Sequence, residues 1–359
     1  NDAGDSAEVA RLFKERGFKF PTMTDISIWY LGFNWLDPVV GKGDTPEQQV
    51  RNRKLRQALS IAIDWDEFNR IFPKAAGEVA QGPLPGGVFG SRHGSAEGLN
   101  AITHRWVNGQ AVRRPIEDAK KLLAEAGYPD GRDARSGKPL VLNYDVGAAN
   151  TPDSKANLDW TAKQFAKLGI QLEIRATDYN QFQDKVRRGK HQIFTWGWLA
   201  DYPDAENFLF LLYGPGAKSV HDGENAANYQ NAEYDRLYST LRFMDDGPAK
   251  QAVIDKMVRI LHEDAPWSWG YFPYSSGAYH RWVRNGKPSI MVRDQAQYYR
   301  LDTAERSRSL QDWNHPVYWP VLAVLAVLAA MAWGAVKILR ARDQQTALPR
   351  PVPSSQRGR

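Results

Sequence analysis

The sequence predicts an α/β fold followed by one membrane-spanning helix near the C-terminus. Segments with apolar residues at helical spacing alternate along the chain with segments in which apolar and polar residues alternate. The chain has 359 residues, of which 42% are hydrophobic and 25% charged, close to the globular average and enough for a large core. A stretch of twenty residues, 317–336, carries no charge and gives the membrane prediction.

Charge and cysteine usage exclude several classes of function. The formal net charge is +6, but the residues from 337 onward hold six basic side chains against one acidic side chain, which leaves +1 for the body. A body with a net charge of only +1 lacks the excess of positive charge that is typical of nucleic-acid-binding proteins. The chain has no cysteine, so disulfides, thiolate nucleophiles and zinc–thiolate sites are excluded.

We predict no metal site, no cofactor and no catalysis. The seven histidines lack the H-E-x-x-H spacing, and no Walker loop, G-x-G-x-x-G or G-x-S-x-G motif occurs. Acidic pairs such as Asp201 with Asp204 could serve a glycosidase, but such pairs are common in loops and helix caps. An extracellular hydrolase therefore stays only as an alternative.

The first predicted elements are two helices and a loop. Residues 46–63 place apolar side chains at helical spacing opposite a polar face. Asp64 and Glu67 form a D-x-x-E capping box that starts a second helix, which runs to Ile71. Residues 81–90 hold too many prolines and glycines for a helix or a strand, so we predict a loop.

The middle of the chain predicts parallel strands. A helix at 115–126 has proline at its start and Gly127 as its C-terminal cap. A strand at 140–146, a helix at 151–168 and a strand at 170–176 follow. This βαβ order implies that the two strands run parallel in one sheet.

A second β, α, β step and three further elements complete the body. A short helix at 180–188 leads into an aromatic strand at 192–199. Two helices, near 232–243 and 248–263, precede a strand at 267–275. The pattern is α/β throughout.

The apolar stretch 317–336 matches a bilayer in length. A helix of twenty residues spans about 30 Å, the thickness of the hydrocarbon core. Tyr318, Trp319 and Trp333 stand near its ends, where interfacial aromatic residues are expected, and basic residues follow it. The positive charge predicts a cytoplasmic C-terminus. A buried core helix is the alternative, although such helices rarely stay apolar on every face.

The most unusual stretch is WGWLADYPD, residues 196–204, at the C-terminal end of a predicted strand. In open α/β sheets, ligands bind beyond that end. Trp196 and Trp198 share one face of the strand, either as core residues or as a ligand wall. A helix-capping role suits Asp204 at least as well as Asp201, which leaves Asp201 to meet a cationic group of a ligand.

Six stretches in order resemble the extracellular solute-binding proteins of family 5, the dipeptide, oligopeptide and nickel receptors of ABC importers. They are WYLGFNWLDPVVG (29–41), VRNRKLRQALSIAID (50–64), GPLPGGVFG (82–90), EDAKKLLAEAGYPDG (117–131), GWLADYPDAENFL (197–209) and HEDAP (262–266). The similarity covers roughly residues 22–301, and several motifs in register are more specific than any one alone.

The resemblance implies a periplasmic-binding-protein-like (type II) clamp of two lobes, of which this chain supplies mainly the second. The N-terminal portion of the family has no counterpart before residue 29, so we expect the C-terminal half of a longer receptor. The expected parts are an N-terminal remnant or linker (1–28), a solute-binding domain (29–302), a stalk (303–316), a transmembrane helix (317–339) and a disordered basic tail (340–359).

The resemblance also assigns binding residues. In oligopeptide-binding relatives an aspartate of the G-W-x-A-D-Y motif receives the ligand's α-amino group, and Asp201 stands at that place. Trp198 would line a side-chain pocket and Tyr202 would help to hold the loop. Some dipeptide-binding relatives carry an arginine for the ligand carboxylate in the loop at 147–152, which has no basic residue here, so a longer peptide is favoured. The other predicted binding residues are neighbours in the motif, Trp196, Gly197 and Ala200.

The function implied is that of a substrate-binding component of an ABC importer. It would capture peptides outside the membrane and deliver them to the permease subunits, held at the lipid bilayer by its C-terminal helix. Such a protein binds its ligand and does no chemistry. An oligosaccharide receptor of the same family is the first alternative, because the predicted cleft is rich in tryptophan.

Overall fold

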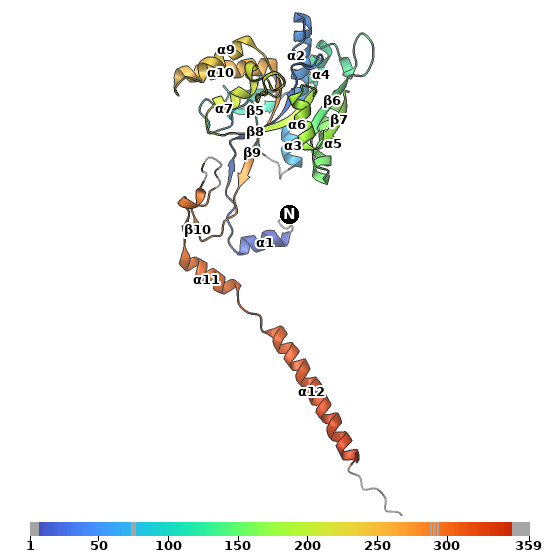
Figure 1. Ribbon diagram of the computed structural model, residues 1–359, viewed down its shortest axis with the longest axis vertical. Coiled ribbons are helices and arrows are strands. Elements are labelled where there is room, and N and C mark those ends of the chain that lie inside the picture. The colour runs from blue at the N-terminus through green and yellow to red at the C-terminus, as the bar shows by residue number, and fades with distance from the viewer. Residues whose placement is uncertain (1–6, 73–76, 288, 290–291, 293, 347–359) are drawn as a thin grey trace, which may run out of the picture. The chain divides into compact units, whose positions relative to one another are not determined.

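The computed structural model describes residues 7–72, 77–287, 289, 292 and 294–346 (Figure 1). They fall into two compact units. The larger unit comprises the described residues of Asn1–Arg281 and Asn285–Tyr299, and the smaller unit those of Trp282–Arg284 and Arg300–Arg359. All the predicted binding residues belong to the larger unit.

A seven-stranded mixed sheet forms the centre of the larger unit. Its strand order is β1-β9-β2-β8-β6-β7, and β3 pairs with β9 beside that path. The strands are β1 (Thr22–Thr24), β2 (Ser27–Phe33), β3 (Gly77–Val79), β6 (Val141–Gly147), β7 (Gln171–Thr177), β8 (Ile193–Leu199) and β9 (Trp267–Ser276).

The parallel half of the sheet confirms the predicted βαβ order. β6 and β7 run parallel in register, with Val141 opposite Gln171, and α5 (Pro152–Ala166) connects them. β8 joins the other side of β6, also parallel, with Tyr144 opposite Ile193. Each helix and strand predicted between residues 46 and 275 occurs, with ends within two residues of the expected ones.

The other half of the sheet adds antiparallel strands to the predicted α/β fold. β2 runs antiparallel to both β8 and β9, and no strand was predicted at its position. Six of the seven residues of β2 are buried and only Trp29 is exposed. The strand therefore lacks the alternation of apolar and polar residues that reveals a half-exposed strand.

Helices cover both faces of the sheet, and each face has its own hydrophobic cluster. We call them the α5 face, where Leu31 packs with α2 to α5, and the α10 face, where Tyr30 packs with α6, α7, α9 and α10. These two neighbours in β2 point to opposite faces, as strand geometry requires. The helices are α2 (Pro46–Ala62), α3 (Trp65–Ile71), α4 (Ile116–Glu125), α6 (Tyr179–Arg187), α7 (Glu206–Leu209), α9 (Ala232–Leu241) and α10 (Pro248–Asp264).

Smaller elements complete the larger unit. Its short helices and 3-10 turns are α1 (Ala7–Glu15), η3 (Pro129–Gly131), η4 (Phe210–Leu212), η5 (Gly214–Gly216), α8 (Lys218–His221) and η6 (Gln295–Tyr298). The hairpin of β4 (His104–Val107) and β5 (Gln110–Arg113) was not predicted. Its turn, Asn108-Gly109, has positive φ at both residues, and this dipeptide between short apolar runs is a hairpin signal. The segment expected as a remnant or linker, 1–28, contributes α1, β1 and the start of β2.

Helix caps explain where α2 and α3 begin. The side chain of Asp64 accepts a hydrogen bond from the backbone N–H of Glu67, as predicted for α3. A complete capping box starts α2, where Thr45 and Gln48 bond reciprocally. Each cap satisfies backbone N–H groups that the first turn of a helix leaves unpaired.

The smaller unit holds the two C-terminal helices. β10 (Val283–Arg284) pairs with β11 (Arg300–Leu301), and α11 (Thr303–Trp313) follows in the predicted stalk. α12 (Trp319–Thr346) includes all but the first two residues of the predicted transmembrane helix, 317–339. Its segment Trp319–Gln344 is long and apolar enough to cross a membrane and is not buried against any other described part of the protein. The predicted tail starts inside α12, and residues 347–359 lie outside the described residues.

Candidate functional site

The two tryptophans of the WGW stretch point to the α10 face, side by side as predicted. Trp196 packs against Phe182 of α6 with ring centroids 5.2 Å apart, and Trp198 meets Phe210 edge-on at 5.1 Å. The indole Nε1 of Trp198 donates a hydrogen bond of 3.1 Å to Oδ1 of Asn207. Both side chains are partly buried and pack against the cluster of that face.

Asp201 lies two residues beyond the end of β8 and is exposed. Its backbone N–H donates to Oδ1 of Asn207 at 2.9 Å, and Nδ2 of Asn207 donates to Oδ2 of Asp201 at 3.4 Å. The preceding Ala200 is buried, and its N–H donates to the carbonyl of Ile26 at 3.0 Å, which fixes the chain where the strand ends. The carboxylate is therefore held by one long hydrogen bond and otherwise faces solvent.

Tyr202 and Asp204 hold the rest of the loop. The hydroxyl of Tyr202 donates to Oε2 of Glu206, and the hydroxyl of Tyr238 donates to Oε1 of the same carboxylate. Burial and the Glu206 carboxylate raise the pKa of Tyr202, which keeps the phenol a donor. Asp204 accepts from the N–H of Glu206 and from Nζ of Lys250, each at 2.8 Å. Asp204, not Asp201, thus accepts from the first turn of α7 and pairs with Lys250, although the N-cap residue of α7 is Ala205, which makes no side-chain cap.

Gly197 lies on the opposite face of β8, the α5 face, where it pairs with Trp29 of β2. A Cβ atom on Gly197 would lie 2.9 Å from Cδ2 of the Trp29 ring, closer than real Cβ contacts allow. Glycine therefore permits the indole to lie directly over the strand. Trp29 is 44% exposed, so its outer side is free to contact a ligand.

Trp29 forms one wall of a cavity of about 540 Å³ on the α5 face, in the size range of small-molecule sites. The cavity lies toward the C-terminal ends of β6 and β8, where α/β sheets bind ligands. Its walls are largely aromatic and come from β2, α3, β6, α5 and β9. They include Trp29, Trp65, Phe68, Tyr144, Trp160 and Tyr271.

A few polar groups stand among these aromatic walls. The hydroxyls of Tyr144 and Thr195 are hydrogen bonded at 2.6 Å, and burial raises the pKa of Tyr144 to about 12. The buried Nε1 of Trp160 has no hydrogen-bond acceptor among the described residues. The loop 147–149 and the first turns of α5 form the rim. A largely apolar cavity of this size suits a ligand with an apolar body.

The six predicted binding residues lie around β8 but do not line this aromatic cavity, which borders the opposite face from Trp196 and Trp198. Sequence reasoning missed the cavity because its aromatic walls come from five elements. The available signal was the position of Trp29 within the family-like stretch 29–41. Among the described residues, no cluster of three or more histidine, aspartate or glutamate side chains is arranged to hold a metal ion.

Comparison with known proteins identifies the family. Residues 3–219 match the model described as bacterial extracellular solute-binding proteins, family 5 Middle, and the chain belongs to this family. It is 24% identical to heme-binding protein A of Haemophilus influenzae over 75% of this chain and 44% of that protein. The dipeptide-binding protein of Escherichia coli is 22% identical over 72% of this chain and 43% of its own length.

A solved structure shows the same fold. The periplasmic binding protein DppA from Helicobacter pylori, in complex with the peptide STSA, superposes with a TM-score of 0.63 at 21% identity. The match covers 82% of this chain and 51% of that one. The chain therefore spans about half the length, or less, of the proteins it matches. The predicted periplasmic-binding-protein-like fold is confirmed, and the family consists of solute-binding receptors rather than enzymes.

Proposed function

We propose that this chain is part of the substrate-binding component of an ABC importer that captures peptides of oligopeptide length. The observation that most directly supports this proposal is the exposed carboxylate of Asp201, which Asn207 holds in place just beyond the end of β8. Family membership supports the receptor role. The printed names of relatives include dipeptide-binding and oligopeptide-binding proteins, which supports a peptide as the ligand.

Asp201 is suited to receive the terminal ammonium group of a peptide. Among the described residues, no lysine or arginine forms an ion pair with this carboxylate, so its charge is available to a ligand. Hydrogen bonds between an ammonium group and a carboxylate are stronger than bonds between neutral groups. The fixed backbone around Ala200 and Asn207 means that little ordering is needed when a ligand binds.

The aromatic cavity supports an apolar side chain as the neighbouring part of the ligand. Trp29 lies over Gly197, four residues before Asp201, and also forms a wall of the cavity. The loop 147–152 at its rim has no basic residue to pair with a terminal carboxylate. A ligand whose carboxyl end lies beyond this region fits better than a dipeptide, and its backbone can form further hydrogen bonds in the cleft.

Binding measurements with Asp201→Ala test this role. The full chain in detergent is titrated calorimetrically with a pentapeptide and with the same peptide acetylated at its N-terminus. We expect Asp201→Ala to abolish binding of the free-amine peptide, and acetylation to weaken binding to the unchanged protein by at least tenfold, because each change removes the ammonium–carboxylate pair. Asp184→Ala removes an exposed carboxylate on α6 that pairs with Arg188 and serves as the control. A free-amine peptide held equally tightly by Asp201→Ala would refute the amine-binding role.

An oligosaccharide is the second candidate ligand, because the exposed face of Trp29 and the aromatic cavity walls could stack on sugar rings. Such a ligand carries no ammonium group for Asp201. Oligosaccharide binding that survives Asp201→Ala, with no peptide binding by the unchanged protein, would favour this candidate. An extracellular hydrolase would instead show turnover of the bound ligand.

We further propose that α12 anchors the protein in the cell membrane with its C-terminus in the cytoplasm. The segment Trp319–Gln344 has 26 residues, which as a helix spans about 39 Å, enough to cross the hydrocarbon core. Lys337 and Arg340 lie near its C-terminal end, the side that the positive-inside rule assigns to the cytoplasm. Tethering would keep the receptor near its permease subunits. We expect deletion from Val317 onward to release the protein from the membrane fraction, and retention there would contradict the anchor.

A further inference from the structure

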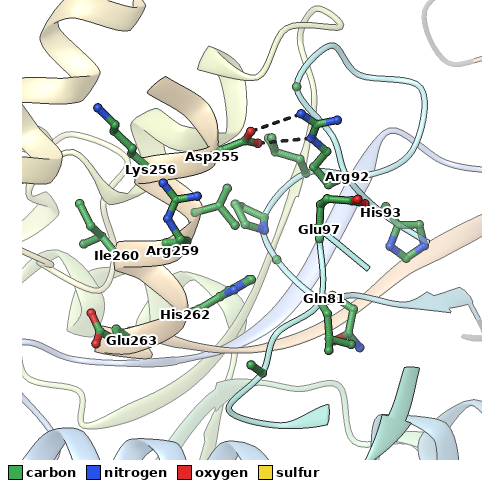
Figure 2. A pocket seen from close by; sticks show the side chains of 18 of the residues that line it. Gln81, Arg92, His93, Glu97, Asp255, Lys256, Arg259, Ile260, His262 and Glu263 are labelled. Atoms are coloured by element: carbon green, nitrogen blue, oxygen red, sulfur yellow. Dashed lines mark hydrogen bonds and ion pairs between the residues drawn. The ribbon is translucent and has the colours of Figure 1, made fainter. Parts of the chain in front are cut away.

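A second cavity, of about 880 Å³, lies on the α10 face between α10 and the loop at residues 81–102 (Figure 2). Its volume is within the range of small-molecule sites. None of its described lining residues belongs to the aromatic cavity or to the predicted peptide-binding residues. The proposed peptide site therefore does not explain why the charged and polar side chains of this second cavity lie together.

Helix α10 supplies a wall of mixed charge, with the cations Lys256 and Arg259 and the carboxylates Asp255 and Glu263. Arg259 and His262 are three residues apart, share one side of the helix and both line the cavity, and Figure 2 shows the ring of His262 directed toward the facing loop. Among the described residues, no carboxylate forms an ion pair with Arg259. Arg92 of the loop pairs with Asp255 of α10 at 3.3 Å and ties the two walls together. Arg259 is thus a cation that remains available to a ligand.

His262 adds a hydrogen-bond acceptor. Burial lowers the pKa of its imidazole to about 4, so the ring is neutral near pH 7. The backbone of Gln81 forms a hydrogen bond with this ring, while Nε2 is buried without a partner among the described residues. Nε2 is therefore the nitrogen that carries the lone pair. A Cβ atom on Gly82 would lie 3.3 Å from Nε2, so the glycine leaves room in front of it.

The facing loop carries further acceptors. Nε2 of His93 lies 2.8 Å from a carboxylate oxygen of Glu78, which can only accept, so Nε2 is the donor. Nδ1 of His93 is buried without a partner among the described residues. Glu97 also lines the cavity. A hydrogen bond from its own backbone N–H lowers the pKa of Glu97, so its carboxylate is ionised.

The space between these walls is partly apolar. The aliphatic side chains that line it include Leu84, Leu99, Ile102, Leu237, Val258 and Ile260. The cavity thus combines a cation without an ion pair, Arg259, with anionic and lone-pair acceptors and an aliphatic surface. A ligand that matches all three must carry a negative group, a positive group and an aliphatic chain.

We propose that this cavity is an accessory binding site for a small zwitterion of the amino-acid class with an aliphatic side chain. The carboxylate of the ligand pairs with Arg259. Its ammonium group donates to Glu97 and to Nε2 of His262, and its side chain packs on the aliphatic surface. This site is distinct from the proposed peptide site and does not depend on it.

A series of three probes tests the three features without changing the protein. The full chain in detergent is titrated calorimetrically with L-leucine, with 4-methylpentanoate, which lacks the ammonium group, and with 3-methylbutylamine, which lacks the carboxylate. We expect leucine to bind one-to-one and each analogue at least tenfold more weakly, because each loses charge-assisted hydrogen bonds. The proposal is overturned if leucine shows no binding at millimolar concentration or if either analogue binds as tightly as leucine.

Two substitutions then locate the site. Arg259→Gln removes the cation, and His262→Asn keeps a donor toward Gln81 while removing Nε2. We expect each to weaken leucine binding at least tenfold, with melting curves that confirm folding. Arg175→Gln, at an exposed ion pair on β7, is the control and should have no effect.

Asp201→Asn separates this site from the peptide site. We expect it to leave leucine binding unchanged, whether or not it affects peptides. Leucine binding that is lost in Asp201→Asn and retained in Arg259→Gln would overturn the accessory site and place the amino acid at the end of β8.

Discussion

The two faces of the sheet use the same strand in different ways. On the α10 face, Phe194 and Trp196 of β8 pack against helices and help to close the core. On the α5 face, Thr195 borders the aromatic cavity and Gly197 supports Trp29 at its wall. Abundant tryptophan therefore does not by itself mark a ligand wall. Alternate residues of one strand can build the core on one side and a ligand site on the other.

The largest expected effect contrasts a core residue with a cavity residue. Phe194 is fully buried and packs on Gly32, where an added Cβ atom would lie 2.4 Å from its ring. We expect Phe194→Ala to lower the free energy of unfolding by about 3–5 kcal/mol in urea titrations, because a large cavity would remain.

Trp29→Ala is the matched change on the α5 face. Trp29 is 44% exposed, so we expect a loss of stability of about 1 kcal/mol or less, together with weaker peptide binding. Equal losses of stability in Phe194→Ala and Trp29→Ala would contradict the distinction between the two faces.

The next effect is a pH dependence that originates on the α10 face. Nε2 of His191 bonds to the carbonyl of Ala226 at 3.0 Å, while its buried Nδ1 has no partner among the described residues. Burial lowers the pKa of His191 to about 4, below the value of about 6.5 expected in the unfolded chain. The unfolded state thus binds the proton first as the pH falls. Stability is complete above about pH 6.5 and decreases toward pH 4, by about 3 kcal/mol from this residue.

Unfolding titrations between pH 7 and pH 4 measure this slope. His191→Gln keeps a donor for Ala226 and has no titrating ring, so we expect a shallower slope than in the unchanged protein. His104 and His262, whose pKa values burial also lowers to about 4, maintain part of the slope in both proteins. Identical slopes would show that His191 is not the source.

The smallest expected effect tests whether Gly197 positions Trp29 for ligand binding. Its substitution by alanine would press a methyl group on the Trp29 ring, which is partly exposed and can move. We expect Gly197→Ala to cost about 1 kcal/mol of stability and to weaken peptide binding, since the cavity wall is displaced. Gly216→Ala is the control, because a Cβ atom there meets no other atom within 4 Å. Unchanged peptide affinity in Gly197→Ala would remove Trp29 from the binding site.

The parallel half of the fold was predictable because its strands and helices carry clear periodic patterns. β7 alternates exposed and partly buried residues along most of its length, and Gly127 and Gly169 mark the ends of the helices before β6 and β7. β2 was not predictable in this way, because nearly all its residues are buried and their order shows no alternation. Its pairing with β8 and β9 was therefore missed.

The candidate site was predictable only where it is local in sequence. Asp201 lies just beyond a strand end, as expected, and Asp204 is the carboxylate that accepts from the N–H of Glu206 and pairs with Lys250. The aromatic cavity depends on the antiparallel placement of β2 and on packing by α3 and α5. It brings together Trp29, Trp160 and Tyr271, whose separation in the sequence gives no local signal. Long-range strand pairing decides which residues share such a cavity.

Photo-crosslinking tests the central claim most directly, namely that a peptide binds at the end of β8 with a side chain on the α5 face. A pentapeptide with a free N-terminus and a benzoylphenylalanine residue is irradiated with the full chain, and the labelled residues are mapped by mass spectrometry. We expect labelling of cavity walls such as Phe68 and Trp160, and its loss in Asp201→Ala. Labelling confined to α9 and α10, or labelling of the cavity unaffected by Asp201→Ala, would contradict the claim.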